Sequence, residues 1–143
     1  MARIRISIPG NFSFTTIIPI RITDLNYGGH VGNDAILSLL HEARVQFLKQ
    51  HGFTELDFAG TSLIMSDVAI EYKAEVFYGS SLKVMVTAAD FTRAGFDIFY
   101  KVVDAGNEQL IALAKTGMVC FDYNTKKITA VPPQVLDSLK ASS

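Results

Sequence analysis

The sequence predicts an α+β domain in which a long antiparallel β-sheet packs against one long helix. Two observations predict it: an amphipathic helical segment over residues 33–51, and strand-like segments joined by short turns that follow it. The chain has 143 residues, close to the commonest size of a single domain. We therefore expect one domain over residues 1–143.

The first strand is expected within residues 12–22, where apolar and β-branched side chains alternate onto one face. Pro19 lies inside this segment and has no N–H to donate to a neighbouring strand. The strand should therefore lie at an edge of the sheet or carry a bulge.

The helix follows a glycine-bearing loop, with Asn33 as the expected N-cap and Gly52 as the expected C′ residue. Its apolar side chains form a broad stripe, which predicts packing against the sheet. The stripe consists of Ile36, Leu39, Leu40, Ala43 and Phe47.

Four further strands are expected over residues 62–78, 82–90, 96–104 and 109–121. The last is an almost continuous apolar run, which is typical of a central strand covered on both faces. A short helix is expected in the tail, within residues 132–140.

Composition excludes several functional classes. The chain is 49% apolar and 19% charged, which excludes a disordered protein and predicts a homodimer or homotetramer that hides the surplus apolar surface. With a net charge of −1 and no long Lys/Arg run, we expect no nucleic-acid partner. No apolar stretch reaches the length of a membrane span or of a secretory signal, so the expected location is the cytoplasm. A lone cysteine, Cys120, fits a reducing compartment.

Polar chemistry is concentrated in the loop before the helix, residues 24–33. A helix N-terminus offers unpaired N–H groups that can hold the oxyanion formed during acyl transfer. Asp24, Asn26 and His30 add an acid/base group, an amide and an imidazole, and Gly28 and Gly29 allow close approach of a ligand. The same residues also suit a simple turn, so composition alone leaves both interpretations open.

This loop and the helix after it share a spaced motif with a known family. The motif resembles the signature of the 4-hydroxybenzoyl-CoA thioesterase-like branch of the hot-dog superfamily, and the similarity covers roughly residues 12–122. It consists of Asp24-x-Asn26-x-x-Gly29-His30-Val31-x-Asn33 followed by Glu42-Ala43-Arg44.

The resemblance implies a hot-dog fold, in which the sheet wraps around the central helix, and a pocket built from two chains. It also implies hydrolysis of an acyl thioester of CoA or acyl-carrier protein to free acid and thiol. By position, Asn26 stands where many members have the catalytic aspartate, and the Asn33 N–H resembles the donor that polarises the thioester carbonyl. Gly28, Gly29 and Val31 are the expected substrate contacts of the loop.

Asn26 cannot take a proton, so another group must activate water. We favour His30 as the base, because histidine titrates at a pKa of about 6.5, with Asp24 fixing the imidazole and Asn26 orienting water or thioester. Two further departures from the motif are Gly32, where an asparagine is usual, and Ile36, where a tyrosine is common.

Glu42, on the helix, is the rival base, although a glutamate that pairs locally is the commoner case. His41, His51 and Cys120 have no metal-ligand spacing, and neither a P-loop nor a dinucleotide fingerprint is present, so we expect no metal and no cofactor. The alternative function is a non-catalytic acyl-CoA-binding protein.

Overall fold

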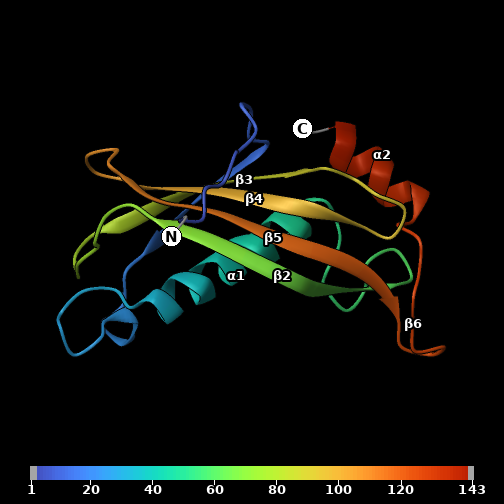
Figure 1. The fold of residues 1–143 in the computed structure, drawn as a ribbon, viewed down its shortest axis with the longest axis horizontal. Helices are drawn as coiled ribbons and strands as arrows, with labels where there is room; N and C mark the ends of the chain where they lie inside the picture. Colours follow the sequence, from blue (N-terminus) through green and yellow to red (C-terminus); the bar gives the residue numbers. More distant parts are fainter. Residues whose placement is uncertain (1–2, 142–143) are drawn as a thin grey trace.

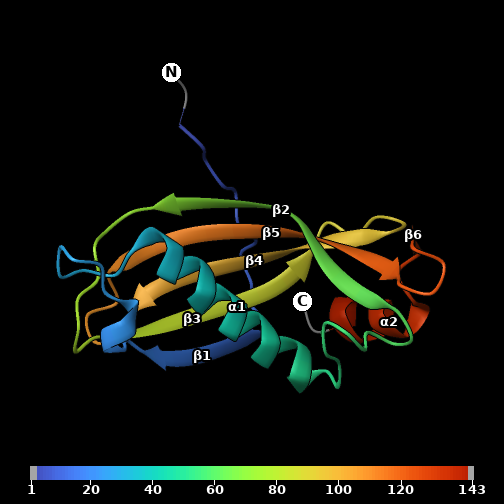
Figure 2. The same ribbon diagram turned by 90° about the horizontal axis from the view of Figure 1, so that it is seen from below.

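Six strands form one antiparallel sheet that wraps along helix α1 in the computed structural model, which describes residues 3–141 (Figures 1 and 2). The strand order is β1-β3-β4-β5-β2, with the short β6 beside β5. This confirms the predicted α+β class and adds one strand to the expected order. The elements are β1 (Phe14–Pro19), η1 (Ile22–Asp24), α1 (Asn33–Gln50), β2 (Ser62–Tyr72), β3 (Ser81–Ala89), β4 (Gly95–Asp104), β5 (Leu110–Asp122), β6 (Lys127–Ile128) and α2 (Pro133–Ala141).

The two edges of the sheet are β1 and β2. Pro19 lies at the end of β1 opposite Ser81 of β3, so the edge position that its missing N–H predicts is confirmed. β5 lies between β4 and β2, as its continuous apolar run predicts. β2 ends at Tyr72 rather than continuing to residue 78, and a bulge interrupts its pairing with β5 between Met65 and Asp67.

Helix α1 is flanked by a glycine near each end. Its N-cap is Gly32 and not Asn33, which is already the first helical residue. The physical reason is the backbone, which is extended at Gly32 and already helical at Asn33, and a β-carbon at position 32 would lie only 2.7 Å from Oδ1 of Asp34. Gly52 has a φ of +84°, so its expected role after the helix C-terminus is confirmed. The predicted apolar stripe of the helix is buried against the sheet.

One charged residue of the helix also lies in the core. The side chain of Arg44 is 6% exposed, and its guanidinium donates a hydrogen bond of 3.2 Å to the hydroxyl of Tyr100. That hydroxyl lies 2.8 Å from Oγ1 of the buried Thr116, and Nε of Arg44 lies 3.5 Å from Glu55 Oε1. The arginine of the Glu-Ala-Arg motif therefore ties the helix to β4 and β5.

The two ends of the described chain lie against the sheet. Residues 3–13 cross the face opposite α1, where the amide of Ile6 donates to Glu71 Oε1 at 3.1 Å (Figures 1 and 2). α2 lies beside the C-terminus of α1, where Nδ1 of His51 is 2.8 Å from Oγ of Ser138. Within the described residues, neither helix combines the length and the apolar character needed to cross a membrane.

Candidate active site

The loop that carries the predicted site is a closed turn. The amide of Asn26 donates to the carbonyl of His30 at 2.9 Å, and the amide of Gly29 donates to the carbonyl of Asn26 at 3.1 Å. Gly29 has a φ of +83°, which favours glycine at this position. The amide of Val31 then donates to the carbonyl of Val76 at 2.8 Å, which ties the turn to the segment after β2.

Asp24 holds the start of this loop. Its side chain is 5% exposed and accepts hydrogen bonds from the amide of Arg21 at 2.8 Å and from the guanidinium of Arg21 at 3.2 Å. The sequence hypothesis gives Asp24 the task of fixing the His30 ring, but its carboxylate is instead held by Arg21. Its carbonyl also accepts a hydrogen bond from Gly32 at 3.2 Å, so Asp24 positions the loop against the helix N-terminus.

The carboxylate beside His30 comes from another part of the chain. Nε2 of His30 lies 3.9 Å from Oε1 of Glu75, and the imidazole packs edge-on against the ring of Phe77. About a third of the His30 side chain is exposed, so the ring can reach both solvent and a bound ligand. Sequence reasoning missed Glu75, because no motif spacing links it to the loop.

Asn26 and His30 face each other across Gly28. A β-carbon on Gly28 would lie 3.2 Å from Oδ1 of Asn26 and 3.4 Å from Nε2 of His30. The Asn26 oxygen accepts a hydrogen bond of 2.9 Å from the Gly28 amide, which fixes the side chain in this position. The amide and the imidazole that we predict to work together are therefore neighbours in the structure.

The N-terminus of α1 borders the same space. The first hydrogen bond within the helix runs from the amide of Ile36 to the carbonyl of Gly32 at 3.1 Å. The amides of Asn33, Asp34 and Ala35 precede it and have no acceptor within the helix. Their partial positive charge suits an oxyanion.

A cavity of about 280 Å³ lies beside this helix end, between the loop and the segment after β2. The hydroxyl of Tyr72 closes one side of it by donating a hydrogen bond of 3.1 Å to the carbonyl of Asn33. Its lining is His30, Val31, Asn33, Ile36, Tyr72, Lys73, Ala74, Glu75, Val76 and Ile111.

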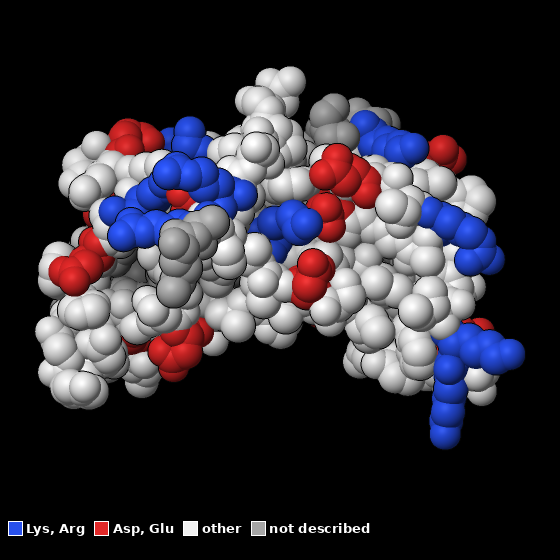
Figure 3. Space-filling model, viewed as in Figure 1, with Lys and Arg blue, Asp and Glu red and all other residues white. Residues whose placement is uncertain are grey.

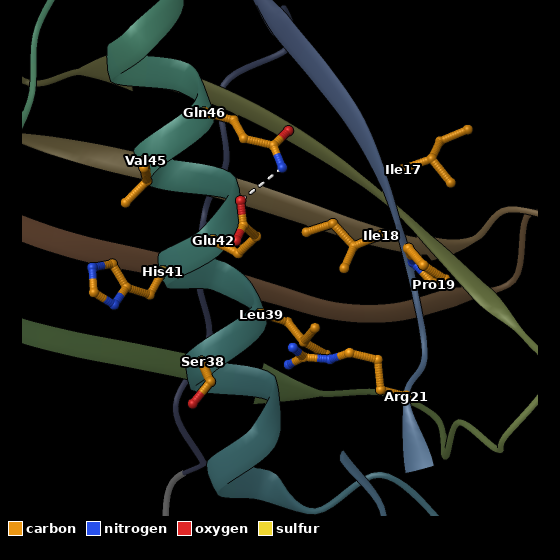
Figure 4. A pocket seen from close by; sticks show the side chains of 10 residues that line it. All are labelled: Ile17, Ile18, Pro19, Arg21, Ser38, Leu39, His41, Glu42, Val45 and Gln46. Atoms are coloured by element: carbon orange, nitrogen blue, oxygen red, sulfur yellow. Dashed lines mark hydrogen bonds between the residues drawn. The ribbon is translucent and has the colours of Figure 1, made fainter. Parts of the chain in front are cut away.

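Glu42 lies in a different pocket, of about 530 Å³, between α1 and β1 (Figure 4). Its carboxylate points toward β1 and accepts a hydrogen bond of 2.8 Å from Gln46 (Figure 4). Nine residues after Asn33, it stands about two and a half turns and about 13 Å along the helix from that residue, on the opposite side of the helix. Glu42 can therefore join the loop in one site only if the two come from different protomers.

The remaining predicted candidates are accounted for by local contacts. Nε2 of His41 lies 2.9 Å from Oε1 of Glu55, and His51 contacts α2 as described above. Cys120 is buried in β5, and burial raises the pKa of its thiol, so it is a poor nucleophile. Among residues 3–141, no group of three or more His, Cys, Asp or Glu side chains could hold a metal ion.

Comparisons with known proteins identify the family. The model of the thioesterase-like superfamily matches residues 20–139. The chain belongs to the thioesterase-like superfamily. A protein of Aquifex aeolicus (strain VF5) is 27% identical over 114 residues, which are 78% of this chain and 86% of that protein.

Solved structures of family members confirm the hot-dog fold. A 1,4-dihydroxy-2-naphthoyl-CoA thioesterase from Synechocystis has a TM-score of 0.82 at 22% identity, over 89% of this chain and 95% of that one. A thioesterase from Thermus thermophilus, solved with coenzyme A and Zn, has a TM-score of 0.82 at 18% identity, over 94% of this chain and 96% of that one. The family match and the fold support thioester hydrolysis as the activity of this chain.

Proposed function

We propose that this protein hydrolyses acyl-CoA thioesters to a free acid and free coenzyme A. The observation that carries the proposal is the pairing of a polar turn, residues 26–30, with the free N–H groups at the start of α1. This arrangement places an imidazole and the start of α1 at one small cavity, with the Asn26 amide beside the imidazole across Gly28. Membership of the thioesterase-like superfamily supports it.

In the proposed reaction, the thioester carbonyl oxygen binds at the N–H of Asn33, where the helix dipole stabilises the oxyanion. His30 takes a proton from the attacking water, and Asn26 orients the water or the thioester from across Gly28. Glu75 is the carboxylate nearest to the His30 ring, at 3.9 Å from its Nε2. Val31 lines the cavity, and Gly28 and Gly29 precede it in the loop as the other proposed substrate contacts.

A cationic group at the cavity fits an anionic substrate such as acyl-CoA. Lys73 lines the cavity, and its ammonium also pairs with Glu71. The Thermus thermophilus relative was solved with coenzyme A, which supports CoA as the thiol. An acyl-carrier protein would present the same thioester and is the second form of the substrate. Such substrates are cytoplasmic, and we place the protein there.

The exposed edge of β2 supports a homo-oligomer. Along the described residues, the outer side of β2 has no neighbouring strand, and it exposes Met65, Val68 and Tyr72. On the face seen in Figure 3, the lower centre has few charged side chains, whereas Lys and Arg side chains lie at its upper left and along its right side. We propose that a second copy pairs there, edge to edge with β2.

Light scattering at micromolar concentration tests this assembly. The wild type should have at least twice the chain mass of 15.7 kDa. Val68→Asp should shift it toward the monomer, because the added charge would be buried at the strand edge. A wild type that stays monomeric would contradict the proposed pairing, and would also leave Glu42 without a route to the loop.

Release of free thiol from short, long and aromatic acyl-CoAs tests the activity, with a direct binding measurement on the same substrates. We expect turnover well above the rate without protein for at least one acyl class. Binding without turnover on every substrate would favour the alternative, a non-catalytic acyl-CoA-binding protein in which Asn26 marks lost chemistry.

A further inference from the structure

Asp34 is a charged side chain at the site that the proposed reaction does not yet use. It is exposed in the first turn of α1. A β-carbon on Gly32 would lie 2.7 Å from Oδ1 of Asp34 and 3.8 Å from Cβ of Asn26. The carboxylate therefore stands beside the Asn26 side chain, in the space that glycine leaves open.

Asn26 thus has a polar neighbour across each of two glycines. Across Gly28 lies the imidazole of His30, and across Gly32 lies the carboxylate of Asp34. Both neighbours lie close to Asn26, at the end of the helix where the amide groups are free. This arrangement gives a water molecule next to Asn26 two possible acceptors for its two hydrogens.

The phenol of Tyr72 supports this location of the charge. Burial raises the pKa of Tyr72, and the negative charge of Asp34 raises it further. Tyr72 lines the cavity together with His30, so the charge of Asp34 reaches a group at the cavity wall from outside the lining. The other acid of the loop, Asp24, is already held by Arg21.

We propose that Asp34 is a catalytic residue whose carboxylate accepts one hydrogen bond from the attacking water while His30 takes the other proton. This role rests on the proposed thioester hydrolysis. The water O–H bond to His30 breaks, the water oxygen bonds to the thioester carbon, and the carbonyl electron pair moves onto the oxygen at Asn33. Collapse of this intermediate breaks the C–S bond, and the departing thiolate takes the proton from the imidazolium. Asp34 takes no proton in these steps.

Asp34 also has a possible structural role, because an acidic residue in the first helical turn stabilises the helix dipole. Two substitutions separate the roles. Asp34→Asn removes the charge, whereas Gly32→Ala keeps the charge in the first turn but moves Oδ1 away from Asn26. Alanine fits the backbone at position 32, where φ is −73°.

The test compares the kcat and KM of these variants on the best acyl-CoA substrate, with circular dichroism to confirm folding. We expect both Asp34→Asn and Gly32→Ala to lower kcat by about 10²-fold, the lower range for a group that assists proton transfer, with little change in KM. Adding Asn26→Asp to Asp34→Asn should recover part of the loss, because the new carboxylate borders the same space from the other side.

Two results would overturn the role of Asp34. One is an Asp34→Asn variant with the kcat of the wild type. The other is a lowered kcat for Asp34→Asn together with a wild-type kcat for Gly32→Ala. That pair of results would mean that Asp34 only stabilises the helix dipole. A wild type without any turnover would overturn the proposed function as well, so the two failures are distinguishable.

Discussion

Polar groups meet helix α1 at two places, its buried face and its N-terminus, and the two places differ in whether these groups have hydrogen-bond partners within the fold. On its buried face, Arg44 is bonded to Tyr100, which in turn contacts Thr116. At its N-terminus, the amides before Ile36 have no acceptor in the helix, and of the neighbouring loop side chains Asn26 is exposed and His30 is half-buried. Buried polar groups need partners to be stable, so the first group has little freedom to act on a ligand. The second group has that freedom, and we assign the chemistry to it.

The largest effect should follow from His30→Ala. Loss of a general base typically costs about 10²–10⁴-fold in rate, so kcat should fall by that order while the thermal unfolding temperature stays close to that of the wild type. Glu42→Gln is the matched control and should cost little, since Glu42 lies in another pocket (Figure 4). The reverse ranking would move catalysis to the helix and leave the loop as a binding element.

Arg44→Ala should have the opposite effect to His30→Ala, lowering the stability of the fold rather than the rate of the reaction. It removes a charge-assisted hydrogen bond and the packing of a buried stem, at a cost of about 2–4 kcal/mol in the free energy of unfolding. Denaturant unfolding measures this cost, with the exposed Lys49→Ala of the same helix as the control. A protein of unchanged stability that had lost turnover would contradict the separation of the two groups.

Tyr100→Phe should give a smaller loss of stability. Without the hydroxyl, the Arg44 guanidinium and the Thr116 hydroxyl each lose a buried partner, for about 1–2 kcal/mol. Removing the hydroxyl of the exposed Tyr123 should leave unfolding unchanged. Equal stability of the two variants would mean that water or a rearranged Arg44 replaces the buried contact.

The smallest effect should be the contribution of His51 to the pH dependence of stability. Burial lowers the pKa of its imidazole from the ordinary value of 6.5. Because the unfolded chain then binds the proton more readily than the folded one, stability should be full above about pH 6.5 and fall as the pH drops below it. His51→Gln should reduce the difference in unfolding temperature between pH 7.5 and pH 5.5. A steeper dependence in the variant would place the acid sensitivity in other groups.

The sequence predicted those parts of the fold whose signals are local. Pro19 predicted an edge strand, the run at 109–121 predicted a central strand, and the apolar stripe predicted the buried face of α1. Arg44 follows Leu40 by four residues and so falls on that same face, but its charge concealed the pattern. Glu75 could not be predicted as the partner of His30, since only the sheet brings the two segments together.

The helix start shows how a motif can conceal a contact. A motif comparison shows Gly32 only as a departure from a usual asparagine, and Asp34 only as a charge in the first turn. The structure links them, because the missing β-carbon at Gly32 leaves space for the Asp34 carboxylate beside Asn26. Such a contact depends on side-chain direction, which residue spacing alone does not specify.

Product analysis in ¹⁸O-labelled water tests the assigned chemistry most directly. The wild-type protein is incubated with the acyl-CoA that it binds best, and the thiol released and the label in the acid are measured together. Direct attack by water predicts equal amounts of free CoA and free acid, with one ¹⁸O atom in each acid molecule. Bound acyl-CoA that releases no thiol above the uncatalysed rate would contradict hydrolysis at the loop and the start of α1.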